Sequence, residues 1–184
     1  MIFRRKRIDP MRETIYAMYH VKQGISRIEA LMDRISSRRK RMLEVAGQLE
    51  ARGETFLAKK YVEEISKLDK IYARLADLRL VLEKISMGLE YALSVKNFQE
   101  IAREVSKLLK DLKKLPETTI PEIGLILVNL EHSIRNIEEA TIGVADSHDF
   151  FVASDSEVNR IMSEAREILR KKLETELSVN DVSS

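Results

Sequence analysis

Apolar residues recur at alternating spacings of three and four from residue 18 onward, the pattern of a helix that packs against a partner helix. Asp9 and Pro10 supply an N-cap and a first-turn proline just before this run. The pattern predicts one helix from about residue 10 to about residue 50, roughly 60 Å long. Its seam is apolar except for Arg39, and comprises Met18, Val21, Ile25, Ile28, Met32, Ile35, Arg39, Met42, Ala46 and Leu49.

A second apolar series follows the short turn Ala51–Thr55, in which Gly53 suits a helix C-terminus. Because the turn is short, we expect the second helix to return antiparallel to the first. No stretch shows the strict alternation of a strand. The predicted fold class is therefore all-α, a long antiparallel helical hairpin followed by shorter helices. The second seam comprises Ala58, Tyr61, Ile65, Leu68, Ile71, Leu75, Leu78, Leu82, Ile85, Leu89 and Ala92.

The third series does not continue the phase of the second, because the earlier spacing would place Lys96 and Gln99 on the seam. No glycine other than Gly88 and no proline interrupts the surrounding sequence, and Asn97 with Glu100 forms a candidate capping box. A helix break and one continuous helix both remain open. We expect a conformational hinge at Ser94, Val95, Lys96 and Asn97. The third seam is Phe98, Ile101, Val105, Leu108, Leu112 and Leu115.

The segment LPETTIP separates these helices from a more acidic region. A fourth helix is predicted to end near Gly143, and a fifth is predicted to start at a capping box of Ser154 and Glu157. The final SVNDVSS is expected to fray. The predicted organisation is a tail at 1–9, the hairpin with the third helix at 10–115, and acidic C-terminal helices with a tail at 116–184.

The composition gives little support to catalysis. The chain has no cysteine, and its three histidines lie on separate segments without a recognised catalytic motif. Asp146, His148 and Asp149 stand close together, but a solvated loop is favoured over a metal site. No secretory signal and no apolar stretch of roughly 20 residues is visible. We therefore expect a cytoplasmic protein that is not an enzyme and needs no metal or cofactor.

Charge is distributed unevenly along the chain. Residues 1–42 contain 12 basic and 4 acidic residues, a net charge of +8, whereas residues 115–184 contain 6 and 14, a net charge of −8. Such asymmetry predicts that the basic end binds an anionic partner. The acidic end could also fold back on the basic end, or meet it in a neighbouring copy.

The tetrapeptide RRKR occurs twice within the basic end, and the two copies have different settings. Arg38 and Arg41 of the second copy share a helix face with Arg27 and Arg34, away from the seam, which indicates a binding face. The first copy follows three apolar residues, as in an interfacial anchor. Nucleic acid is the alternative partner, although no aromatic platform for bases is evident. The candidate anchor comprises Met1, Ile2, Phe3, Arg4, Arg5, Lys6 and Arg7.

The basic first helix, the long hairpin and the stretch RGETFLAKKYVEEISKLDKIYARLADLRLVLEKI, followed by shorter helices and an acidic C-terminal half, resemble the ESCRT-III superfamily. The resemblance covers about residues 10–175 and is closest to the archaeal cell-division (Cdv) paralogues. It implies a filament subunit that remodels anionic membranes at the division site. Family members switch from a closed form to an open form in which the second and third helices join, and they assemble with copies or paralogues.

The resemblance also implies extraction by an AAA ATPase that grips a C-terminal motif. Asp155, Val158, Met162 and Arg166 match the helical version of that motif, but Ile161 and Ala165 stand where the family has Arg and Leu. No counterpart of the winged-helix region that some archaeal members carry is expected from these residues. Direct recruitment of the ATPase and recruitment through a paralogue are therefore both open.

Overall fold

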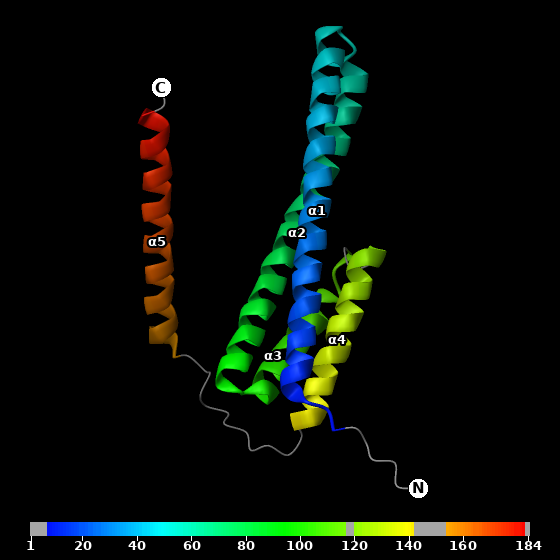
Figure 1. Ribbon diagram of the computed structural model, residues 1–184. Helices are drawn as coiled ribbons and strands as arrows, with labels where there is room; N and C mark the ends of the chain where they lie inside the picture. The colour runs from blue at the N-terminus through cyan, green and yellow to red at the C-terminus, as the bar shows by residue number, and fades with distance from the viewer. Residues whose placement is uncertain (1–6, 117–119, 142–153, 183–184) are drawn as a thin grey trace. The chain divides into compact units, whose positions relative to one another are not determined.

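The computed structural model describes residues 7–116, 120–141 and 154–182. Within these ranges the ordered elements are helices and no strand occurs, which confirms the predicted all-α class. The chain divides into two units, residues 1–144 and 145–184, each of which is described by itself. The first unit contains α1 (Pro10–Ala51), α2 (Thr55–Val95), α3 (Phe98–Leu112) and α4 (Pro121–Thr141), and the second contains α5 (Asp155–Val182) (Figure 1).

The predicted hairpin is formed by α1 and α2, which run antiparallel (Figure 1). Asp9 caps α1 as expected, since its side chain accepts a hydrogen bond from the Met11 backbone N–H, with N···O 3.0 Å. At the other end of α1, Gly53 adopts φ +75° in the turn, a left-handed conformation that glycine adopts at little cost. A capped start and a glycine turn thus set the two ends of a 42-residue helix.

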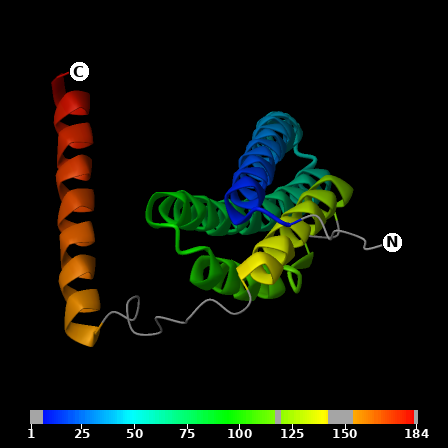
Figure 2. The same ribbon diagram turned by 60° about the horizontal axis from the view of Figure 1, so that its bottom comes forward.

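The core lies in the half of the hairpin nearer the N-terminus. There α4 packs against α1, while α3 packs against α4 and α2 (Figure 2). Every one of the largest fully buried side chains comes from α1, α2 or α4: Thr14, Val21, Ile28, Leu75, Leu78, Leu82, Ile85, Leu89, Leu130, Ile134 and Ile137.

The other half of the hairpin, toward the α1–α2 turn, is only two helices thick (Figure 1). Its buried apolar residues are Ala46, Ala58 and Ile65. The predicted seam positions Tyr61 and Ile71 are wrong as core positions, since 37% and 38% of their surfaces are exposed. A two-helix layer covers only one side of each helix, so wide side chains at the edge of the seam remain in solvent.

Gly24 permits the close approach of three helices. A Cβ atom at this position would lie 3.0 Å from Cγ2 of Ile126 on α4 and 3.2 Å from Cδ1 of Leu82 on α2. A side chain here would force its neighbours apart. The hydrogen bond from Asn136 Nδ2 to Glu13 Oε2, 3.3 Å long, further joins α4 to α1. The attachment of α4 thus depends on a small residue in the middle of α1.

The start of α5 has the predicted capping box in full. Glu157 N–H donates to Ser154 Oγ over 3.3 Å, and Ser154 N–H donates to Glu157 Oε2 over 3.0 Å. The expectation of a frayed SVNDVSS tail is wrong for residues 178–182, which continue the helix. No glycine or proline interrupts this stretch, so local sequence does not stop it. None of the described helices has the length and apolarity to cross a bilayer.

Candidate binding surface and hinge

The four arginines predicted as a row lie on α1, and all four are exposed. Residues seven, four and three positions apart fall on one side of a helix, so Arg27, Arg34, Arg38 and Arg41 form a stripe. The residues buried against α2 and α4, such as Val21 and Ile28, lie on the other side. Within the described ranges no salt bridge holds any of the four guanidinium groups. A cationic stripe is therefore available to a partner.

The end of this row nearer the hairpin turn lies closer to the seam than the sequence predicted. Arg38 and Arg41 line a shallow hollow whose other walls are the side chains of Met42, Val45 and Tyr61. Across the helix pair, the pKa of the Glu64 carboxyl is lowered, first by its hydrogen bond from Lys67 and to a lesser extent by the charge of Arg38. The row therefore turns from the open face of α1 toward the edge of α2.

Arg39, the predicted exception in the seam, does point toward α2. Its Nε donates to Asp69 Oδ1 over 2.7 Å, and its Nη2 lies 3.4 Å from Asp69 Oδ2. Both side chains remain about half exposed, at 43% and 49%. An ion pair this exposed contributes about 0–1 kcal/mol. The pair favours one register of the hairpin more than it adds stability.

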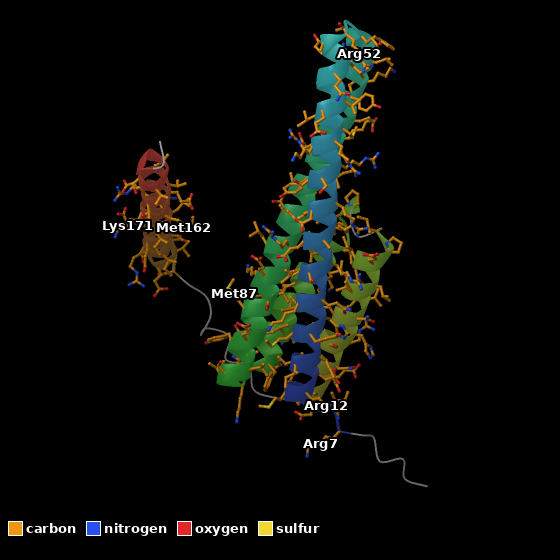
Figure 3. The ribbon with its side chains drawn as sticks, turned by 45° about the horizontal axis from the view of Figure 1, so that its top comes forward. Arg7, Arg12, Arg52, Met87, Met162 and Lys171 are labelled. Atoms are coloured by element: carbon orange, nitrogen blue, oxygen red, sulfur yellow. The ribbon has the colours of Figure 1, made fainter. Side chains whose placement is uncertain are left out.

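The predicted N-terminal anchor falls largely outside the described residues, since Met1–Lys6 are not described. Its last member, Arg7, is exposed and lies near Arg12 at the end of the hairpin farthest from Arg52 (Figure 3). The cationic tail is thus attached to the four-helix end of the molecule. Its proposed insertion into a membrane remains a prediction.

The first three turns of α1 expose an apolar surface that the seam pattern did not predict. Met11, Ile15, Tyr16 and Tyr19 expose 40%, 53%, 43% and 63% of their surfaces. Arg12 covers part of this region, because its Nε and Nη2 lie 3.1 and 3.0 Å from the Tyr16 hydroxyl. These hydrogen bonds raise the pKa of Arg12 above its ordinary value. The repeat of apolar residues four apart, outside the seam, was the available signal.

The helix break occurs at the predicted hinge. Helix α2 ends at Val95, Lys96 adopts the left-handed conformation with φ 58° and ψ 28°, and α3 begins at Phe98. Lys96 is the one non-glycine residue with positive φ among the described residues. Its N–H donates to the Ala92 carbonyl over 2.8 Å, which closes the last turn of α2.

The capping box predicted at this break does not form as expected. Asn97 is the N-cap of α3, yet its side chain caps no backbone N–H. Instead Asn97 Nδ2 donates to Glu100 Oε2 over 3.3 Å. Because the Asn97 side chain pairs with Glu100, it does not accept a hydrogen bond from the first backbone N–H groups of α3. The N-terminus of α3 is therefore only weakly stabilised by capping. The break is maintained by packing of α3 rather than by strong caps.

The described residues contain no cluster of three or more His, Asp or Glu side chains arranged to hold a metal ion. Asp146, His148 and Asp149, considered for a metal from the sequence, lie outside the described residues. A hollow lies between α3 and α4, where Glu131 forms ion pairs with Lys113 and Arg135. These charges compensate one another, which is typical of a structural ion network.

Two curated cell-division proteins are similar in sequence to this chain. Cell division protein B of Sulfolobus acidocaldarius is 22% identical over 153 residues, which cover 83% of this chain and 59% of that protein. Cell division protein B1 of the same organism is 23% identical over 130 residues, which cover 70% of this chain and 61% of that protein. The chain thus spans about 60% of the length of these curated relatives.

No family model and no solved structure matches the chain. The two curated similarities nevertheless confirm the predicted resemblance to archaeal cell-division proteins.

Proposed function

We propose that this chain is a membrane-binding, filament-forming subunit that acts in cell division. The observation that carries the proposal is the exposed arginine row on α1, which lies away from the buried residues of α1 and turns toward the edge of α2 at Arg38 and Arg41. Cationic side chains near an anionic bilayer contribute about 1 kcal/mol each. Four arginines and the basic tail therefore supply enough attraction for peripheral binding. The similarity to two cell division proteins supplies the setting.

Assembly is proposed to use the break at Lys96. If α3 leaves α4 and continues α2 as one helix, the apolar side chains of α3 become available to a neighbouring subunit. Five α3 residues are buried in the described conformation: Ile101, Ala102, Val105, Leu109 and Leu112. A second copy or a paralogue that covers them would compensate the exposure. The weak capping at Asn97 supports a small local barrier to this change.

Helix α5 is the proposed regulatory segment. Its apolar side chains, including Met162, Leu169 and Leu173, are about half exposed, and its own unit contains no second described element. Such a face is typical of a helix that docks on another surface. We propose that α5 masks the basic hairpin in the unassembled chain and is the segment that an AAA ATPase or a paralogue engages. The role is structural rather than enzymatic, on the cytoplasmic membrane surface at the division site.

A vesicle sedimentation series tests this proposal. The chain should sediment with vesicles of phosphatidylglycerol and phosphatidylcholine, but not with phosphatidylcholine alone, and rising salt should release it. Replacing Arg27, Arg34, Arg38 and Arg41 with Ser should abolish binding. The control replaces four exposed cations elsewhere in the first unit (Lys59, Lys70, Lys84 and Lys107), which removes the same total charge and should bind nearly as the unchanged chain does.

Two further measurements separate this proposal from the nucleic-acid alternative. Negative-stain microscopy should show filaments on the anionic vesicles, and more of them when Leu169 and Leu173 are replaced by Ser to weaken masking. Tight binding to duplex DNA without any binding to anionic vesicles would instead favour a nucleic-acid-binding coiled coil.

A further inference from the structure

The first three turns of α1 carry apolar side chains that the fold does not use. Met11, Ile15 and Tyr19 lie four residues apart, on one line along the helix, and Tyr16 lies beside them. Their exposed fractions run from 40% to 63%. On the opposite side of the same turns Ala17 and Val21 are fully buried. The packed side of α1 is therefore complete without these four residues, which we call the α1 apolar patch.

The charged side chains around the patch have a net positive charge. Arg7, Arg12 and Lys22 are exposed at this end of the helix. The two acidic residues in the same turns have partners within the protein: Asp9 accepts a hydrogen bond from the backbone of Met11, and Glu13 accepts one from Asn136. The three basic residues outnumber them, so an incoming partner meets apolar carbon edged by net positive charge. Arg4, Arg5 and Lys6 precede this region in the sequence.

This chemistry fits the interfacial layer of an anionic bilayer. Tyrosine is enriched at membrane interfaces, where its ring is buried and its hydroxyl stays near water. Helices that lie in the interface combine an apolar stripe with flanking Lys and Arg. The acidic residues 115–184 of a second copy are the other candidate occupant, and their binding would appear as a change of oligomeric state without lipid. We propose that the α1 apolar patch enters the headgroup layer and sets how α1 lies on the membrane, an inference that rests on the proposed membrane-binding function.

The α1 apolar patch meets the line of the arginine row at Tyr16. Tyr16, Arg27 and Arg34 return to the same side of the helix at spacings of eleven and seven, whereas Met11, Ile15 and Tyr19 lie roughly 60–140° farther around it at 100° per residue. Both surfaces are on the exposed part of α1, so a helix that rests on the membrane between them brings the patch and the arginines to the same headgroups. The apolar end anchors the helix and the cationic part holds it against the surface. Figure 3 shows Arg12 at one end of the hairpin and Arg52, just after α1, at the other end.

The absence of tryptophan from the chain allows a direct test. Tyr19→Trp places a single fluorophore in the patch, and Met87→Trp places one on α2 at nearly the same exposure, 63% against 64%. On vesicles of phosphatidylglycerol and phosphatidylcholine, emission from Tyr19→Trp should shift to shorter wavelength and be quenched by brominated lipid. Emission from Met87→Trp should change little. An unshifted Tyr19→Trp on vesicles that bind the chain would overturn the inference and leave membrane binding itself intact.

A second experiment measures the contribution of the patch. Ile15→Ser with Tyr19→Ser should raise the lipid concentration for half-maximal binding by about tenfold or more. The control Leu125→Ser with Val128→Ser removes side chains that are 63% and 57% exposed on α4, and should leave binding unchanged. Equal binding by both variants would refute the role of the patch. A change of oligomeric state without lipid would reassign it to protein contacts, and no vesicle binding by any form would refute the proposed function as well.

Discussion

Replacing Lys96 with glycine should hold the chain in its bent α2–α3 conformation. Lys96 occupies the left-handed region, with φ 58° and ψ 28°. A non-glycine residue there is disfavoured by roughly 1 kcal/mol, and glycine removes that penalty. In a continuous helix the same glycine would be unfavourable by about 1 kcal/mol relative to lysine. The two effects add, because one stabilises the bent form and the other destabilises the straight form.

The sum is about 2 kcal/mol, or about a 30-fold shift of the equilibrium toward the bent form. Lys96→Ala is the matched control. Alanine has the same left-handed penalty as lysine and only a slightly higher helix propensity, so the shift should stay within about twofold in the opposite direction. If assembly requires the straight form, the critical concentration for filaments should rise about 30-fold for the glycine variant and stay nearly constant for the alanine variant.

The conformational change can be measured apart from assembly. The chain has no cysteine, so spin labels can be attached at Leu80→Cys on α2 and Lys107→Cys on α3, both exposed positions. In one continuous helix these positions would lie roughly 40 Å apart, 27 residues at the standard rise. In the bent form α3 folds back against α2, so the distance is much shorter. Pulsed electron-spin measurements on free and assembled chains would resolve the two.

Two results would contradict this reasoning. The first is a short label distance in the assembled state, which would show that filaments form without straightening. The second is equal critical concentrations for the glycine and alanine variants, because the backbone preference of residue 96 would then have no part in assembly. Either result would remove the hinge role of Ser94–Asn97 and leave the break as a fixed corner.

Three further predictions test the fold, each by urea denaturation. Gly47→Ala should stabilise the fold by about 1 kcal/mol, because an added Cβ meets nothing within 4 Å. Gly24→Ala should give no such gain, because its Cβ would lie 3.0 Å from the Ile126 side chain. Equal gains in stability from the two variants would refute the close approach at Gly24. Leu130→Ala, at a fully buried position, should destabilise by about 2–5 kcal/mol, and Leu125→Ala, 63% exposed, by less than about 0.5. A double-mutant cycle on Arg39 and Asp69 should give a coupling below about 1 kcal/mol that falls with salt; a coupling above about 2 would show a pair far less hydrated than its exposure indicates.

The long helices were predictable because their signal is repeated over many turns. The seam from Met18 to Leu49 determines one helix face, and the Asp9 cap and Gly53 turn locate its ends. The wrong assignments have a different cause. Tyr61 and Ile71 obey the same spacing as the core residues, but spacing does not reveal how many helices cover a given length of the hairpin. That depends on where α3 and α4 dock, which is a property of the tertiary structure.

The candidate site was predictable in part for the same reason. Arginines seven apart necessarily share a helix side, so the row could be placed from sequence alone. The sequence alone could not predict which side of α1 is covered by α4. The exposure of Ile15 and Tyr19 could therefore not be predicted either. The phase slip near Lys96 located the helix break, because an apolar pattern that changes phase cannot remain on one face of a straight helix. Whether the chain then bends is decided by burial of residues such as Val105.

The division of α1 into an apolar patch and an arginine row agrees with how firmly each part is packed. Insertion of Ile15 and Tyr19 to a fixed depth requires a rigid support, and this end of α1 is held by α2 and α4. Arg38 and Arg41 lie on the two-helix part, where a long hairpin can bend. Attraction to headgroups acts over roughly 8–10 Å at moderate salt and tolerates such bending. In the proposed membrane-bound state, a helix with its apolar contacts at the packed end and Arg38 and Arg41 on the two-helix part would therefore stay bound while the membrane curves.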